Sequence, residues 1–168
     1  MALSTLTHQD GKVIRVTPTV AADTSGDNEV PFLTTEIPNA VGSSGGTSKL
    51  VSCSFTCKQA LALSIDVIFM EVDTDYAAAA GGAINISDAN LVASKPLGWI
   101  QFNGSTSATS LNGNELQSCQ SQSEDPSLPL ILQAASGSTS VYFTAIDRDG
   151  GDTFVDGDLT FKIGVKYL

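Results

Sequence analysis

The stretch DLTFKIGVKY, residues 158–167, decides the fold class of this chain. Its apolar residues recur at every second position and alternate with polar residues or glycine: Leu159, Phe161, Ile163, Val165 and Tyr167. A period of two residues is typical of a β-strand that turns one face to a core and the other face to solvent. We therefore expect an antiparallel strand at this position.

Three further stretches show the same alternation. Their apolar series are Val51, Cys53, Phe55 and Cys57; Leu61, Leu63, Ile65, Val67 and Phe69; and Val141, Phe143 and Ala145. In the second stretch Ile68 and Met70 make the far end apolar on both faces. We expect that end of the strand to be covered on both sides.

Four weaker runs are also strand candidates: residues 13–20, 30–37, 97–102 and 128–133. The prolines fall in or beside these runs and never inside the four strong ones. Proline cannot donate a hydrogen bond to a neighbouring strand, so it is confined to edge strands and strand ends. The weaker runs are therefore predicted to lie at sheet edges.

Helical signal is confined to one short segment. Ser87 is a suitable N-cap for a helix that runs from Asp88 to Val92 before Pro96 stops it. About eight short strands and at most one short helix predict an all-β fold. We expect a single antiparallel β-sandwich or jelly roll over residues 1–168, with residues 1–12 as an N-terminal tail or arm.

The composition excludes two classes of partner. The net charge is −10, with 8 lysine and arginine residues against 18 acidic residues, so the chain lacks the basic surface that neutralises nucleic-acid phosphates. No run approaches the roughly 20 apolar residues of a membrane-spanning helix. The N-terminal residues show neither region of a secretory signal, and we expect a soluble protein made in a cytosol.

The three cysteines, Cys53, Cys57 and Cys119, predict neither a complete disulfide framework nor a zinc site. Their number is odd. On one strand Cys53 and Cys57 would lie about 13 Å apart, beyond the reach of a disulfide bond. The cysteines and the one histidine, His8, make a poor set of zinc ligands. We expect buried thiols that pack as small hydrophobic side chains.

No combination of residues predicts catalysis. His8 is the only histidine and lies in a polar N-terminal stretch, and the chain has no nucleophile elbow. The segment GSSGGTSK, residues 42–49, lacks the Gly-Lys-Ser/Thr ending of a phosphate-binding loop and precedes strand residues, so it predicts a turn. We predict no catalytic residue, no cofactor and no enzymatic activity.

Two groups of residues leave hydrolysis or binding of a sugar open as a function. Asp66, Asp73 and Asp75 fall around one strong strand and could form a carboxylate pair, although solvated strand-end carboxylates are the simpler interpretation. Single aromatic residues on strands more often anchor a core or an interface than stack on a sugar. The aromatic residues that could form a stacking platform are Trp99, Tyr76, Tyr142 and Tyr167.

The acidic stretch DRDGGDTFVDGD, residues 147–158, contains five aspartates. An EF-hand count from Asp147 puts Asp152 where that loop needs glycine, and no helices flank it. The simplest interpretation is a hairpin connection whose carboxylates stay in solvent. No metal site is predicted, although an irregular calcium site stays open. Phe154 and Val155 are unusual in a solvated turn, and we expect them to pack against the same subunit or a neighbour.

Several fragments, taken in order, resemble segments of one known group of proteins. They are TVAADTSGDNEV (19–30), EIPNAV (36–41), SIDVIFM (64–70), INISDAN (84–90), LGWI (97–100) and PLILQAASGSTSVYFTAI (129–146). From about residue 13 onward the chain resembles small structural proteins of tailed bacteriophages, notably marine and cyanobacterial phages. The Cys53/Cys57 pair and the acidic stretch depart from the resemblance and leave partner contacts and ion binding open.

The resemblance implies a non-enzymatic virion protein with a self-associating β-sandwich. Among virion roles we expect a capsid decoration, or cement, protein that binds the outer surface of the major capsid lattice as a homo-oligomer, expected to be a trimer, after synthesis in the host cytoplasm. We place the partner-binding surface on residues 17–41, as an arm that orders on a partner. The alternatives are a tail or neck protein, a secreted calcium- or carbohydrate-binding β-sandwich module and a glycosidase-like enzyme.

Overall fold

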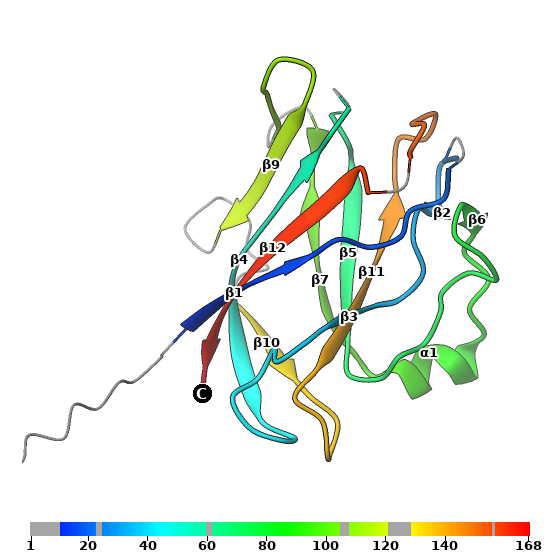
Figure 1. Cartoon of the computed structure of the whole chain (residues 1–168). Coiled ribbons are helices and arrows are strands. Elements are labelled where there is room, and N and C mark those ends of the chain that lie inside the picture. The colour runs from blue at the N-terminus through cyan, green and yellow to red at the C-terminus, as the bar shows by residue number, and fades with distance from the viewer. Residues whose placement is uncertain (1–10, 23–24, 60–61, 105–107, 121–128, 156) are drawn as a thin grey trace, which may run out of the picture.

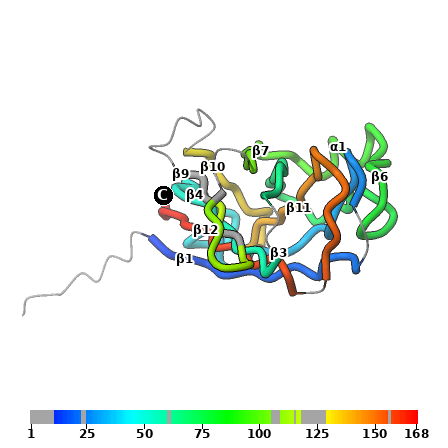
Figure 2. Tube along the Cα trace, turned by 90° about the horizontal axis from the view of Figure 1, so that it is seen from above, coloured from blue at the N-terminus to red at the C-terminus, as the bar shows by residue number. Residues whose placement is uncertain are grey.

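The computed structural model describes residues 11–22, 25–59, 62–104, 108–120, 129–155 and 157–168. Antiparallel strands dominate these residues and form two packed sheets (Figure 1). Seen from above, the sheets lie side by side, and α1 (Asp88–Ser94) and β6 (Gly82–Ala83) lie outside the smaller one (Figure 2). The predicted all-β sandwich is confirmed. No helix within the described residues is long and apolar enough to cross a membrane.

The larger sheet has the strand order β1-β12-β4-β9-β8. Its strands are β1 (Gly11–Val16), β12 (Leu159–Tyr167), β4 (Thr47–Cys57), β9 (Glu115–Gln120) and β8 (Ala108–Ser110), and β10 (Leu130–Gln133) pairs with the first half of β4. The stretch DLTFKIGVKY thus supplies β12, which lies between β1 and β4. Its apolar series is buried except at Tyr167, which is half-buried.

The smaller sheet has the order β3-β11-β5-β7. Its strands are β3 (Thr35–Ile37), β11 (Val141–Asp147), β5 (Ile65–Met70) and β7 (Pro96–Phe102). A two-stranded ladder joins β2 (Glu29–Val30) to β6. As the sequence predicts, α1 begins after Ser87, whose Oγ accepts a hydrogen bond from the Asn90 N–H at 3.2 Å.

The prolines identify the edges of the sheets correctly. The weaker runs form β1, β2, β3, β7 and β10; β1, β3 and β7 end their sheets, and β10 pairs with β4 alone. Pro96 is the first residue of β7, where a missing N–H is tolerated. The sequence does not predict β8 and β9, because ATS and ELQSCQ carry no apolar series.

The core fills the space between the two sheets. Phe143 of β11 and Phe161 of β12 pack edge to face, with ring centroids 5.1 Å apart. Phe55 of β4 and Phe102 of β7 pack in the same way at 5.0 Å. Each pair joins a strand of one sheet to a strand of the other, so aromatic contacts help to hold the sandwich together.

A second apolar cluster lies against the outer face of the smaller sheet. It contains Val30, Met70, Tyr76 and Ala77, and Ile68 is partly buried against it. The segment that follows β5 therefore folds back over that strand. The prediction that the far end of β5 is covered on both sides is confirmed.

The cysteines of β4 are buried on its inward face, as predicted. Cys53 and Cys57 are both fully buried. In the strand register Cys53 lies opposite Cys119 of β9.

Val51 departs from the predicted alternation. β12 pairs Gly164 with Ser52 and Val165 with Leu50, which leaves Val51 in a β-bulge. One extra residue reverses which side chains face inward along the rest of a strand. Leu50 is accordingly buried, whereas Val51 is only half-buried, and the prediction of an inward Val51 is wrong.

The N-terminal boundary differs from the predicted one. β1 begins at Gly11, so the expected tail over residues 1–12 overlaps a strand. Residues 1–10, with His8, lie outside the described residues.

Residues 17–41 do not form an arm that waits for a partner. Among those that the structure describes, Val20, Phe32 and Ile37 are buried in the main core. Because these apolar side chains already pack within the chain, the prediction that the segment orders only on a partner is wrong.

Candidate functional site

The acidic stretch 147–158 crosses from one sheet to the other. β11 pairs with β3 and β5, whereas β12 pairs with β1 and β4, so the predicted hairpin is wrong. Phe154 is 1% exposed and belongs to the main core, as expected. Val155 is 55% exposed, so it does not pack within this chain, and of the two expected contacts only one with a neighbouring subunit stays a prediction.

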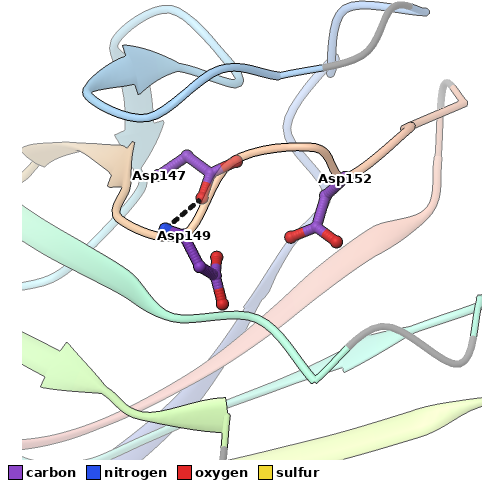
Figure 3. Close-up of side chains that lie close together, drawn as sticks. All are labelled: Asp147, Asp149 and Asp152. Atoms are coloured by element: carbon purple, nitrogen blue, oxygen red, sulfur yellow. Dashed lines mark hydrogen bonds between the residues drawn. The ribbon is translucent and has the colours of Figure 1, made fainter.

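Three aspartates of this crossing gather at one point. Asp147, Asp149 and Asp152 each offer a carboxylate oxygen, and these oxygens all lie within 4.8 Å of one another (Figure 3). Asp147 is fully buried, Asp152 is partly buried and Asp149 is exposed. The expectation that the carboxylates of the stretch stay in solvent is wrong for Asp147 and for Asp158, which is 6% exposed.

Only one oxygen of Asp147 is satisfied by the protein. Oδ1 accepts hydrogen bonds from the N–H groups of Asp149 at 3.2 Å and Gly150 at 3.1 Å, whereas the buried Oδ2 has no hydrogen-bond partner within the part of the chain that the structure describes. Burial has the largest effect on the pKa of Asp147 and raises it, and the nearby Ser25 side chain acts in the opposite direction. The Ser25 hydroxyl also donates to the Gly26 carbonyl oxygen at 3.5 Å. A buried carboxylate oxygen without a donor is costly and rare.

Burial raises the pKa values of two carboxylates in the cluster, and neighbouring negative charge adds to the effect at Asp152. Burial raises the pKa of Asp147 above its ordinary value of 3.8, and a hydrogen bond from the Gly150 N–H offsets part of the effect. Burial, followed by the neighbouring charges of Asp147 and Asp149, raises the pKa of Asp152 to about 6. Each shift has the sign expected for a carboxylate that lacks a cation.

The segment that precedes β2 fixes the backbone of the cluster from one side. The Ser25 N–H donates to the Asp152 carbonyl oxygen at 2.7 Å, and the Gly151 N–H donates to the Ser25 carbonyl oxygen at 2.6 Å. The Asn28 N–H donates to the Asp147 carbonyl oxygen at 2.9 Å. These bonds hold two distant segments together around the carboxylates.

Glycine makes this close approach possible. Gly150 has a positive φ of 63°, and a Cβ at this position would lie 2.5 Å from the backbone nitrogen of Asp27. Any larger residue would push the segment away in addition to straining the backbone.

The arginine of the acidic stretch is bonded elsewhere. The Arg148 Nε donates to Asp66 Oδ2 at 2.6 Å, and its guanidinium also donates to the Asn28 side chain. Arg148 therefore neutralises Asp66 rather than the three aspartates.

A further segment contacts the cluster through Asp149. The Ser64 N–H donates to the Asp149 carboxylate at 3.2 Å.

Asp158 has a structural role at the end of the crossing. Its Oδ2 accepts hydrogen bonds from the Val155 N–H at 2.6 Å and from Gln59 Nε2 at 2.5 Å. Asp156 lies outside the described residues. The aspartates of the stretch thus have different surroundings, which the sequence alone does not reveal.

The carboxylates suggested for sugar hydrolysis do not meet. Asp66 lies near the start of β5 and pairs with Arg148, whereas Asp73 and Asp75 follow the other end of that strand and are exposed. Burial first, then the charges of Asp75 and Glu36, raises the pKa of Asp73. The simpler interpretation, carboxylates in solvent at a strand end, fits Asp73 and Asp75.

A pocket of about 260 Å³ opens on the outer face of the smaller sheet, beside α1. Its lining residues are Asp66, Ile68, Tyr76, Leu91, Pro96, Gly98, Trp99 and Arg148. They come from two strands, the helix and the two connections that follow β5 and β11, and no local pattern in the sequence links them.

Of the aromatic residues considered for sugar stacking, only Trp99 presents most of a ring to solvent. Trp99 is 52% exposed, while Tyr76 lines the same pocket but is buried. Tyr142 is partly buried against the outer cluster. The Tyr167 hydroxyl donates to the Asn39 carbonyl oxygen at 3.1 Å. The aromatic residues therefore do not form one platform.

No protein-family model matches this sequence, and no curated protein or solved structure matches it. Function is therefore inferred from the resemblance of the ordered fragments and from the geometry of the surface.

Proposed function

We propose that this chain is a non-enzymatic structural protein of a tailed-phage virion, and that it acts as a capsid decoration protein on the outer surface of the major capsid lattice. The resemblance of its ordered fragments to phage structural proteins supports the role. The antiparallel β-sandwich is compatible with it. In this role the chain is made in the host cytoplasm and acts through its surface.

The observation that carries the proposal is an exposed apolar area around the pocket, which we name the Trp99 surface: Leu91, Pro96 and Trp99. All three side chains line the pocket and are exposed. Apolar side chains grouped at one place on a protein surface mark contact sites, whereas single ones are common everywhere. Tryptophan is also enriched among the residues that dominate the binding energy of interfaces.

Charged pairs flank this apolar area. Arg148 and Asp66 form part of the pocket wall, and Lys95, at the end of α1, pairs with Glu71 at 2.6 Å. An apolar centre with a polar rim is the usual arrangement of a protein interface. We therefore move the proposed partner-binding surface from residues 17–41 to the Trp99 surface.

A homo-oligomer would multiply this contact. A capsid presents the same site many times, so a symmetric oligomer that carries several copies of the Trp99 surface gains affinity without a new contact. We retain a trimer as the proposed assembly, and light scattering or analytical ultracentrifugation of the purified chain measures it directly. A monomer at high concentration would contradict the oligomeric form of the proposal.

The test of the surface is binding to capsid shells of the phage that encodes the chain, followed by co-sedimentation. Trp99→Ser should raise the dissociation constant at least about tenfold, because an interface tryptophan often contributes about 2 kcal/mol or more. The matched control is Val13→Ser, which removes an exposed apolar side chain from β1 in the other sheet. Undiminished binding of Trp99→Ser would remove the Trp99 surface from the proposal, and no binding of the unmodified chain would contradict the decoration role.

A carbohydrate-binding module is the second candidate, because one observation favours it. Trp99 lies beside the polar side chains of Arg148 and Asp66 in the pocket, and sugar recognition combines an aromatic face with polar groups. Trp99 is the only tryptophan, so its fluorescence reports on this pocket alone. Saturable quenching by one member of a glycan panel, lost in Arg148→Met, would favour this candidate over the virion role.

A further inference from the structure

We propose that Asp147, Asp149 and Asp152 form a calcium-binding site, in which one ion is held at the crossing between the two sheets, beside the segment that precedes β2. The inference goes beyond the virion role and does not depend on it.

The spacing of the three carboxylates fits a single ion. Calcium binds oxygen ligands at about 2.3–2.6 Å, so two ligands of one ion lie at most about 5.2 Å apart. The ligand oxygens of Asp147, Asp149 and Asp152 all lie within 4.8 Å of one another. One ion can therefore contact all three carboxylates without rearrangement of the backbone.

The buried oxygen of Asp147 points independently to a cation. Its Oδ2 is buried and has no hydrogen-bond partner among the described residues, while Oδ1 is already bonded to two backbone N–H groups. Asp147 is fully buried, and its ligand oxygen lies among those of the other two aspartates. A metal ion at this point would supply the partner that the protein does not.

No positively charged side chain among the described residues pairs with the three aspartates. Arg148 is the basic residue of the stretch, and its guanidinium donates to Asp66 and Asn28. The Asp149 carboxylate also accepts a hydrogen bond from the Ser64 N–H at 3.2 Å. A backbone hydrogen bond of this kind does not neutralise a carboxylate. Within the described ranges, the three neighbouring carboxylates thus share their site without a paired cationic side chain.

The backbone around the carboxylates is already fixed. Ser25 and Asn28 hold the crossing through three backbone hydrogen bonds to Gly151, Asp152 and Asp147. A site whose ligands are held in place before the ion arrives loses less entropy on binding. The exposed Asp149 leaves one side of the site open to water, which completes the coordination of an ion that takes six to eight oxygens.

The chemistry of the ligands favours calcium over other ions. All three ligands are carboxylates, which are hard oxygen donors, and zinc or copper would be expected to use histidine or cysteine. Magnesium requires near-ideal octahedral geometry and keeps several waters, whereas calcium accepts the irregular arrangement of a loop.

Calorimetric titration of the full chain tests the proposal, after removal of bound metal with EDTA and dialysis. Calcium chloride should bind at one site per chain, with a dissociation constant between about 10⁻⁵ and 10⁻³ M. Magnesium chloride should bind at least about tenfold more weakly. The melting temperature should rise with the logarithm of the calcium concentration. A chain that shows neither heat nor a melting shift with calcium overturns the proposal.

Two variants connect the binding to these residues. Asp149→Asn and Asp152→Asn should each weaken calcium binding at least about tenfold, and in EDTA each should melt at or above the temperature of the unmodified chain, because one repelling charge is removed. The matched control, Asp73→Asn, removes an exposed aspartate outside the cluster and should leave binding unchanged. Retained calcium affinity in both cluster variants, or a loss in the control, would contradict the assignment.

Discussion

Arg148 and Asp66 form an ion pair, with 2.6 Å between Nε and Oδ2, that joins the start of the acidic crossing to the neighbouring strand β5. Arg148 lies in sequence between Asp147 and Asp149, yet its guanidinium lines the pocket beside Trp99. Arg148 thus belongs to the wall of the pocket, whereas its sequence neighbours Asp147 and Asp149 belong to the cluster of three aspartates.

Arg148→Met should destabilise the chain by about 1–3 kcal/mol, because Asp66 is buried and would lose its cation. Urea denaturation measures the change in the free energy of unfolding. The matched control is Lys95→Met, which removes the cation of the Glu71 pair; since that lysine side chain is 57% exposed, the cost should stay below about 1 kcal/mol. Equal effects of the two variants would contradict the assigned role of the Arg148 pair.

Phe154→Ala should lower the free energy of unfolding by about 3–5 kcal/mol, because a fully buried aromatic side chain is replaced by a cavity in the main core. Its sequence neighbour provides the control. Val155→Ala should change the free energy by no more than about 0.5 kcal/mol, because Val155 is largely exposed. Thermal or urea unfolding of both variants decides the matter, and a small effect of Phe154→Ala would mean that the crossing does not pack as described.

Gly150→Ala should destabilise the chain more than Gly137→Ala. Both glycines have a positive φ, of 63° and 88°, so both variants strain the backbone by about 1 kcal/mol or more. Only the Cβ at position 150 meets another atom, the Asp27 nitrogen at 2.5 Å, while the Cβ at position 137 meets open space. Equal melting temperatures for the two variants would show that the segment around Asp27 does not hold the crossing.

In the absence of metal ions, the chain should become more stable as the pH falls from about 7.5 to about 5. When folded, Asp152 takes up a proton near its raised pKa of about 6, whereas in the unfolded chain it does so only near 3.8. Between these values the folded state binds more protons, so the free energy of unfolding rises as the pH falls through 6 and levels off below 3.8. The raised pKa values of Asp147 and Asp73 act in the same direction.

Melting temperatures across this pH range, measured in EDTA, check that sign. Asp152→Asn should flatten the profile, because asparagine does not titrate. Saturating calcium should reverse the trend, since protons compete with the ion for the same carboxylates. A melting temperature that falls steadily on acidification in EDTA would contradict the prediction.

Local alternation was sufficient to predict the four strongest strands and, apart from Val51, their inward faces, because burial on one face imposes a period of two. It could not predict which strands pair. β11 and β12 are neighbours in sequence and both alternate, yet their partners lie in different sheets. The bulge at Val51 shows the same limit, since it arises from pairing with β12 and leaves no mark on the local pattern.

The candidate site was beyond prediction for a similar reason. Asp147, Asp149, Asp152 and Asp158 look alike in the sequence, and only the folded chain separates them. Asp147 becomes buried because its strand enters the smaller sheet, whereas Asp158 is satisfied by a turn. The lining of the pocket combines residues of β5, β7 and α1 with Arg148, so no single stretch could have revealed it.

The position of β12 also governs when the chain can fold. β12 separates β1 from β4, so these two strands, made early in synthesis, have no sheet to share until residues 159–167 have left the ribosome. Pairing between segments so distant in sequence is slow, because a long loop must close, at a cost in chain entropy, before the strands form any stabilising contact. During that interval the apolar faces of β1 and β4 are open to aggregation and to chaperones. The larger sheet can therefore be completed only after β12 has been made.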